Sequence, residues 1–212
     1  MQQENSEEFI EPDKIQIGYL VEKTVLWSEI TGIVSLFHAC FERIKAVDRK
    51  KKIEKLFNSF DWVEHHLDKV TGRRVLSETA LIEHQHELKT AIYLAQVNYD
   101  VIFAPKAMFT REEKKFDIFL IRDAVILKAD LKSITSKNPD TIAKRIKSGS
   151  DQASRIVVQI NSDIDKKALI DGLRSGVERN SLIKEILLFY KSKFYRLPKD
   201  LVLSREIFKV LK

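Results

Sequence analysis

Hydrophobic residues recur every three or four positions in the first third of the chain, a spacing that places them on one face of a helix. The stripe consists of Leu26, Ile30, Ile33, Phe37, Phe41 and Ile44. A basic run over residues 49–52 separates it from a second apolar set at residues 56–63. The pattern predicts helix over residues 18–70. Residues 69–78 contain a glycine and few apolar anchors, and they are predicted to be a connector.

Helical and strand periods alternate from residue 80 onward. A helix is predicted in residues 80–97 and a strand in 99–105, followed by a hairpin in "KFDIFLIRDAVILKADLK", residues 115–132. A helix then begins at Asn138 as N-cap with Pro139 in its first position. A buried strand at 155–160, a helix in 162–178 capped by Ser162 or Asp163, and a hairpin turning at 191–193 complete the chain.

This order, α-β-β-β-α-β-α-β-β, predicts an α/β fold in which a mixed central sheet is flanked by helices. We therefore divide the chain into an all-helical N-terminal region, residues 1–79, and a second domain, residues 80–212. No apolar run is long enough to cross a bilayer, and the start lacks the pattern of a secretory signal. With 44% hydrophobic residues the chain has ample material for a core, and its net charge of +6 is compatible with a polyanionic partner.

The central hairpin carries charges at its ends, where a buried sheet makes them costly. Lys128, Asp130 and Lys132 share one face of their strand, because alternate residues point the same way. If Arg122 and Asp123 form the loop, Asp117 faces Lys128 and Asp130 is its diagonal neighbour.

Two explanations fit these charges. Asp117 and Asp130 converge on a divalent cation such as Mg²⁺, with Lys132 beside it, because two carboxylates remain ionised together only around a cation. Alternatively, Asp117 pairs with Lys128 and Asp130 with Lys132 as an ordinary ion-pair ladder. Glu87 is a third acidic candidate on the preceding helix, or an ordinary solvated glutamate. A zinc site is not expected, since Cys40 is the single cysteine and two histidines two residues apart diverge on a helix.

The order Glu87, Asp117, Asp130-x-Lys132 resembles the PD-(D/E)xK nuclease superfamily, although Phe116 replaces the proline and Asp130 takes the second acidic place. The segments "HELKTAIYLAQVNYDVIFAP", "KKFDIFL", "ILKADLKS" and "IAKRIKSGSDQASRIVVQI" are similar to the C-terminal tRNA-nuclease toxin domain of contact-dependent growth inhibition proteins. This resemblance covers about residues 80–200.

The resemblance implies a restriction-endonuclease-like core and a metal-dependent nuclease that hydrolyses tRNA as a bacterial toxin. The implied catalytic residues are Glu87, Asp117, Asp130, Lys132 and Gln152, of which the three acidic residues bind Mg²⁺ or another divalent ion. Basic residues near this site in sequence are expected to contact phosphates or to form an ordinary solvated face: Lys137, Lys144, Arg145, Lys147 and Arg155.

The implied partners are nucleic acid and an immunity protein, with a cytoplasmic site of action after delivery into a target cell. Residues 1–79 are expected to dock the domain onto a carrier, an immunity protein or a second copy. Two other functions remain open: a DNA endonuclease of restriction or repair type, and a non-catalytic binding module that keeps the fold.

Overall fold

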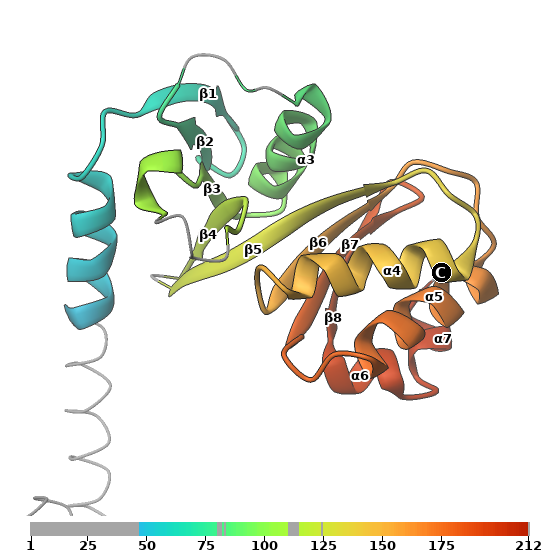
Figure 1. Ribbon diagram of the computed structural model, residues 1–212. Coiled ribbons are helices and arrows are strands. Elements are labelled where there is room, and N and C mark those ends of the chain that lie inside the picture. The colour runs from blue at the N-terminus through green and yellow to red at the C-terminus, as the bar shows by residue number, and fades with distance from the viewer. Residues whose placement is uncertain (1–46, 80–81, 83, 110–114, 124, 212) are drawn as a thin grey trace, which may run out of the picture. The chain divides into compact units, whose positions relative to one another are not determined.

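A computed structural model describes residues 47–79, 82, 84–109, 115–123 and 125–211 (Figure 1). The sheet and the candidate site lie in a compact unit formed by residues 51–212. Within the described part of the chain, no helix has the length and apolarity that a membrane span requires.

An eight-stranded mixed sheet organises this unit, with the strands in the order in which they occur along the chain. They are β1 (Val63–Leu67), β2 (Arg74–Ser77), β3 (Asp100–Phe103), β4 (Ile118–Arg122), β5 (Val125–Ile134), β6 (Arg155–Ile160), β7 (Glu185–Tyr190) and β8 (Lys193–Pro198). β2 runs parallel to β3, and β5, β6 and β7 are mutually parallel. The predicted α/β fold with a mixed sheet is confirmed.

Helices cover both faces of this sheet (Figure 1). The longer ones are α3 (Gln85–Gln96), α4 (Pro139–Ser150) and α5 (Lys166–Glu178), and two short helices, α6 (Lys199–Leu203) and α7 (Ile207–Val210), follow β8. α4 and α5 pack on β6 and β7 through Ile142, Ile146, Leu169 and Leu173. On the other face α3 packs through Ala91, Leu94 and Ala95, whose small size allows the close approach.

The region predicted as all-helical contains two strands. Residues 47–57 are helical, but residues 63–67 and 74–77 are β1 and β2, so the predictions of helix and of a connector are wrong there. The reason is the turn between them: the Asp68 carboxylate accepts hydrogen bonds from the backbone of Val70 and Thr71, and Gly72 has a φ of +69°. Such a side-chain-stabilised turn favours a hairpin.

Residues 1–46 of the predicted helical extension lie outside the described residues. Whether residues 1–79 act as a domain of their own stays a prediction.

Beyond residue 84 the predicted elements are found, with local corrections. Asn138 caps α4 as expected, since its side chain accepts a hydrogen bond from Asp140 N. α5 begins later than predicted, because Asp165, not Ser162 or Asp163, accepts the capping hydrogen bond from Ala168 N. The last hairpin turns at Lys191 and Ser192, which both have positive φ as a tight two-residue turn requires.

Candidate functional site

The hairpin of β4 and β5 brings Asp117 and Asp130 together. Arg122 pairs with Val125 and Ile118 with Ala129, so Arg122 belongs to the strand and not to the predicted loop of Arg122 and Asp123. The register therefore differs from the prediction by two residues, which preserves the faces but changes the partners. Extending it by one position places Asp117 opposite Asp130 instead of diagonal to it.

Asp117 is held at the beginning of β4 by the backbone of β5. Its amide donates to Ala129 O (3.2 Å), and its Oδ2 accepts a hydrogen bond from Leu131 N (2.7 Å). Both backbone groups flank Asp130 in sequence. This pair of contacts fixes the Asp117 carboxyl beside that of Asp130.

Asp130 is fully buried, and its carboxyl lies among charged and polar groups. Its Oδ2 is 2.5 Å from Lys132 Nζ, an ion pair with a lysine side chain that is 15% exposed. This close pairing with the ammonium partly offsets the cost of burying the carboxyl. With its amide nitrogen turned toward them, Gln152 donates to Asp130 Oδ1 (2.5 Å) and to Lys115 O (2.8 Å). Four predicted site residues, Asp117, Asp130, Lys132 and Gln152, thus lie together.

The electrostatics of the carboxyl pair follow from its burial. Burial, together with the neighbouring Asp117 charge, raises the pKa of Asp130 to about 7, while the Lys132 ammonium opposes the shift. A carboxyl that remains protonated near neutral pH in a polar cluster is a common property of functional sites.

Glu87 lies in the first turn of α3, within electrostatic reach of this cluster. Partial burial raises the pKa of Glu87, and the Asp117 charge raises it again, while His84, His86 and Lys132 act in the opposite direction. The alternative of an ordinary solvated glutamate therefore fits Glu87 only in part, because its side chain is half-buried.

The alternative of an ion-pair ladder is found in part. Asp130 and Lys132 do form an ion pair, but Lys128 pairs with Phe119 across the hairpin, and its ammonium lies 4.9 Å from the centre of the Phe116 ring. The expected Asp117–Lys128 pair is therefore not formed.

The carboxylates at this position fit a magnesium ion in their chemistry. Mg²⁺ binds through one or two protein carboxylates and keeps several waters, and the Asp117 and Asp130 carboxyls lie side by side here. In the described part of the chain, however, no three His, Cys, Asp or Glu side chains are grouped so that they hold a metal ion. A divalent ion at Asp117 and Asp130, with Glu87 as a further ligand, therefore stays a prediction.

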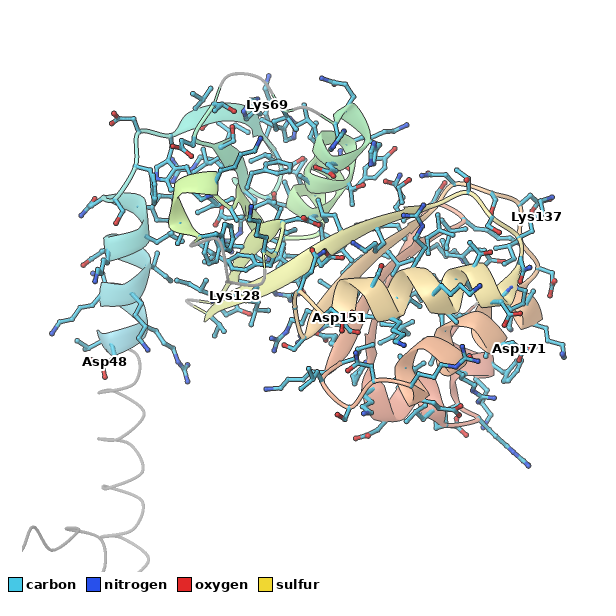
Figure 2. All side chains as sticks on the ribbon, in the orientation of Figure 1. Asp48, Lys69, Lys128, Lys137, Asp151 and Asp171 are labelled. Carbon is cyan, nitrogen blue, oxygen red and sulfur yellow. The ribbon has the colours of Figure 1, made fainter. Side chains whose placement is uncertain are left out.

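The predicted phosphate-binding residues separate into two groups. Lys137, Lys144, Arg145 and Lys147 are exposed, the last three on the solvent face of α4. Figure 2 shows Lys137 and Asp151 at opposite ends of this helix. Since Gly149 of α4 lies against Asp130, this basic row leads away from the site along the helix.

Arg155 differs from the other basic candidates. Its Nε lies 3.5 Å from Oε2 of the buried Glu185, which Arg196 also contacts. The structure therefore gives Arg155 a carboxylate partner within the sheet, and its predicted role in phosphate binding competes with that ion pair.

Two features of the site have no counterpart in the sequence predictions. Gly149 allows the end of α4 to approach Asp130, and Thr90 of α3 donates a hydrogen bond to the buried Gln159 of β6. The small residues of "SGS" near the end of α4 were an available signal for the first. The hydrogen bond between Thr90 and Gln159 depends on how α3 is positioned against β6, which the hydrophobic periodicity of the sequence does not predict.

Comparisons with known proteins bear on this site. No curated protein and no solved structure matches the chain. A family model does match: residues 123–194, which include Asp130, Lys132 and Gln152 but not Glu87 or Asp117, are similar to the contact-dependent growth inhibition CdiA C-terminal domain.

Proposed function

We propose that this chain is a metal-dependent endonuclease that cleaves tRNA as a toxin of contact-dependent growth inhibition. The observation that carries the proposal is the meeting of Asp117, Asp130 and Lys132, with Gln152 on the same carboxyl. The family match over residues 123–194 supports the toxin class. The positive net charge and the exposed basic row on α4 suit a polyanionic substrate.

Each side chain then has a definite task. Asp117 and Asp130, with Glu87 as a further ligand, hold Mg²⁺ or another divalent ion, which supplies charge neutralisation at the phosphate and a more acidic water. Lys132 keeps an ammonium next to Asp130, where it orients the attacking water or stabilises negative charge on the phosphate. Gln152 bridges Asp130 and the backbone of Lys115, which fixes the orientation of the carboxyl.

The test incubates the purified protein with tRNA and, separately, with plasmid DNA, each with Mg²⁺ and with chelator. Cleavage of tRNA that requires Mg²⁺ and disappears in Asp130→Asn is the expected result. Asp123→Asn is the matched control, because Asp123 is exposed in the hairpin turn and its positive φ suits asparagine. Cleavage confined to DNA favours the restriction or repair alternative, and no cleavage of either favours a binding module.

A toxin of this class also requires protection of the producing cell. We propose an immunity protein as the physiological partner, whose co-expression restores growth to cells that make the active chain. Growth arrest by the wild type and by Asp123→Asn, but not by Asp130→Asn, is the expected pattern. Equal growth arrest by the wild type and both variants would show that toxicity does not depend on the Asp130 carboxyl.

A further inference from the structure

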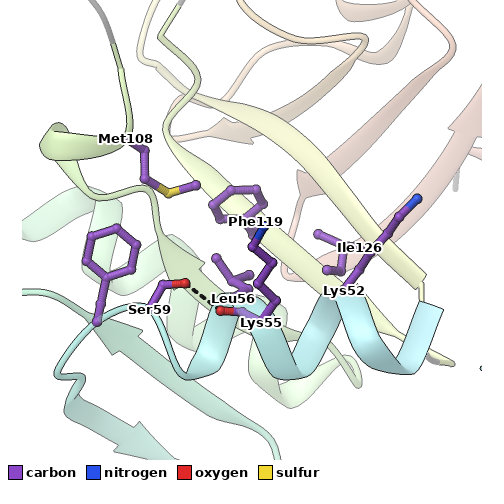
Figure 3. A pocket seen from close by; sticks show the side chains of 8 residues that line it. Lys52, Lys55, Leu56, Ser59, Met108, Phe119 and Ile126 are labelled. Atoms are coloured by element: carbon purple, nitrogen blue, oxygen red, sulfur yellow. Dashed lines mark hydrogen bonds between the residues drawn. The ribbon is translucent and has the colours of Figure 1, made fainter. Parts of the chain in front are cut away.

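A pocket of about 250 Å³ lies between the first described helix and the β4–β5 hairpin (Figure 3). Its lining is Lys52, Lys55, Leu56, Ser59, Phe60, Met108, Phe119 and Ile126. The volume is below the roughly 300–1,000 Å³ of pockets that hold drug-sized ligands. It is therefore suited to one planar ring system rather than to a large ligand.

This pocket shares a sheet face with the candidate site. Phe119 pairs with Lys128 and Ile121 with Ile126, so these side chains point to the same face as Asp117 and Asp130. Ile126 is four residues from Asp130 along β5, a span of about 13 Å at ~3.3 Å per residue. A nucleic-acid strand that is bound at the carboxyl cluster therefore needs only a few nucleotides to reach the pocket.

The chemistry of the lining favours a nucleobase with its phosphates. Phe60 and Met108 are partly exposed apolar walls, while Lys52 and Lys55 extend from the helix at the rim (Figure 3). None of the eight lining residues is acidic. Apolar rings that bury a base beside lysines that meet the backbone are the usual components of single-strand binding surfaces. An apolar side chain of a protein partner would use the walls but leave the lysines without a counter-charge.

We propose that this pocket binds one unpaired base of the nucleic acid that is cleaved at Asp130, so that the enzyme selects single-stranded or loop nucleotides. This inference rests on the proposed nuclease function and adds a substrate class to it. A base inside a duplex is stacked and paired, and extracting it costs free energy, so unpaired positions are preferred.

The experiment uses the full chain carrying Asp130→Asn, in chelator, so that the oligonucleotide is bound but not cut. A short single-stranded RNA with one 5-iodouridine is irradiated on the protein, and the crosslinked peptide is identified by mass spectrometry. The expected crosslink falls on a residue that lines the pocket, and a duplex of the same sequence gives much less. A crosslink that maps elsewhere, or equal crosslinking of the duplex, overturns the proposal.

Two substitutions in this background measure the contribution of the pocket. Phe60→Leu keeps an apolar side chain but removes the ring, and we expect at least a fivefold loss of affinity, as base stacking contributes about 1–3 kcal/mol. Lys55→Glu is compared with Lys69→Glu, which changes the net charge equally at an exposed position beside the edge strand β1. Equal losses of affinity for the two lysine variants would show that the effect comes from net charge alone, and this would overturn the proposed base site.

The outcomes separate this inference from the proposed function. Asp130-dependent cleavage without a crosslink in the pocket overturns the base site and leaves the nuclease intact. A crosslink in the pocket without metal-dependent cleavage supports the base site and counts against the nuclease.

Discussion

Helix α4 reaches Asp130 only because residue 149 has no side chain: a Cβ at Gly149 would stand 2.5 Å from Asp130 Oδ2. The same Cβ would be 3.2 Å from Lys132 Cε and 3.1 Å from Ile156 Cδ1. Asp130 is fully buried on a short side chain, so it cannot move aside without disturbing its contacts. The glycine thus determines how closely the helix covers the ion pair of Asp130 and Lys132.

Gly149→Ala is therefore expected to impair cleavage more than folding. Alanine is the better helix former by about 1 kcal/mol, which offsets part of the clash in the folded state. Displacement of the site by about 1 Å, however, is enough to lower turnover on the order of a hundredfold. Initial cleavage rates and thermal midpoints are measured on the same preparation. Ser148→Ala, at the exposed neighbouring position, is the control, and equal rates for both variants would contradict the prediction.

The buried carboxyl also predicts how stability depends on pH. Because the folded pKa of Asp130 is about 7, against about 3.9 in the unfolded chain, the folded state holds more protons between these values. The free energy of unfolding must then fall as pH rises from about 4 to about 7. Glu87, whose pKa is also raised, contributes with the same sign.

Urea unfolding at pH 5 and pH 8, in chelator, measures this dependence. The wild type is expected to lose on the order of a few kcal/mol between the two conditions, and Asp130→Asn to lose much less. Asp151→Asn, at an exposed carboxyl after α4, should behave like the wild type. A rise in the free energy of unfolding toward pH 8 in the wild type would show that burial does not raise the pKa of the Asp130 carboxyl.

Divalent ions should reverse this destabilisation. An ion that binds only the folded chain adds about 2.7 kcal/mol at a hundred times its dissociation constant. Protons compete for Asp130, so the shift in thermal midpoint with Mg²⁺ or Ca²⁺ is expected to be larger at pH 8 than at pH 5. Asp130→Asn should abolish most of the shift. An equal shift in this variant would place the ion elsewhere on the protein.

Much of the fold was accessible from the sequence because its elements are locally encoded. The cap at Asn138, the apolar run of β6 and the turn at Lys191 each follow from side chains within a few residues. β1 was missed because Glu64, His65 and His66 give no clear period, and its pairing depends on the turn that Asp68 stabilises. The faces of Asp117 and Asp130 were predictable, since a register error of two residues preserves strand parity.

The parts of the site that were not predicted arise from contacts between distant elements. Gly149 is an ordinary helix residue until α4 packs on β5, and Arg155 is an ordinary basic residue until Glu185 of β7 lies beside it. Local pattern carries no information on such neighbours, so from sequence alone Arg155 is indistinguishable from the exposed lysines.

That difference between the basic residues can be measured. Glu185→Gln leaves Arg155 and Arg196 without their shared carboxylate and is expected to cost roughly 1–3 kcal/mol, limited by the partial exposure of both arginines. Lys144→Ala should leave stability unchanged but weaken nucleic-acid binding and its salt dependence. Urea midpoints and binding at several salt concentrations separate the two effects. Glu178→Gln, at an exposed position, is the control for the first substitution.

The contact between Thr90 and Gln159 connects α3 to the sheet one turn after Glu87. Thr90 is 3% exposed and Gln159 8%, and the Thr90 hydroxyl also reaches His86 O. Thr90→Val keeps the shape of the side chain but leaves the Gln159 amide oxygen buried without a donor, which costs about 1–3 kcal/mol unless the helix shifts. A shift of α3 would move Glu87 relative to Asp117.

We therefore expect Thr90→Val to lower the cleavage rate as well as the thermal midpoint, and Thr90→Ser to preserve the rate. Ala91→Gly is the comparison that loosens α3 without removing a hydrogen bond, since Ala91 is fully buried against the sheet. If Thr90→Val and Ala91→Gly lower stability equally but only the valine variant loses activity, the hydroxyl positions Glu87. Equal losses of activity would instead reflect the stability of the helix alone.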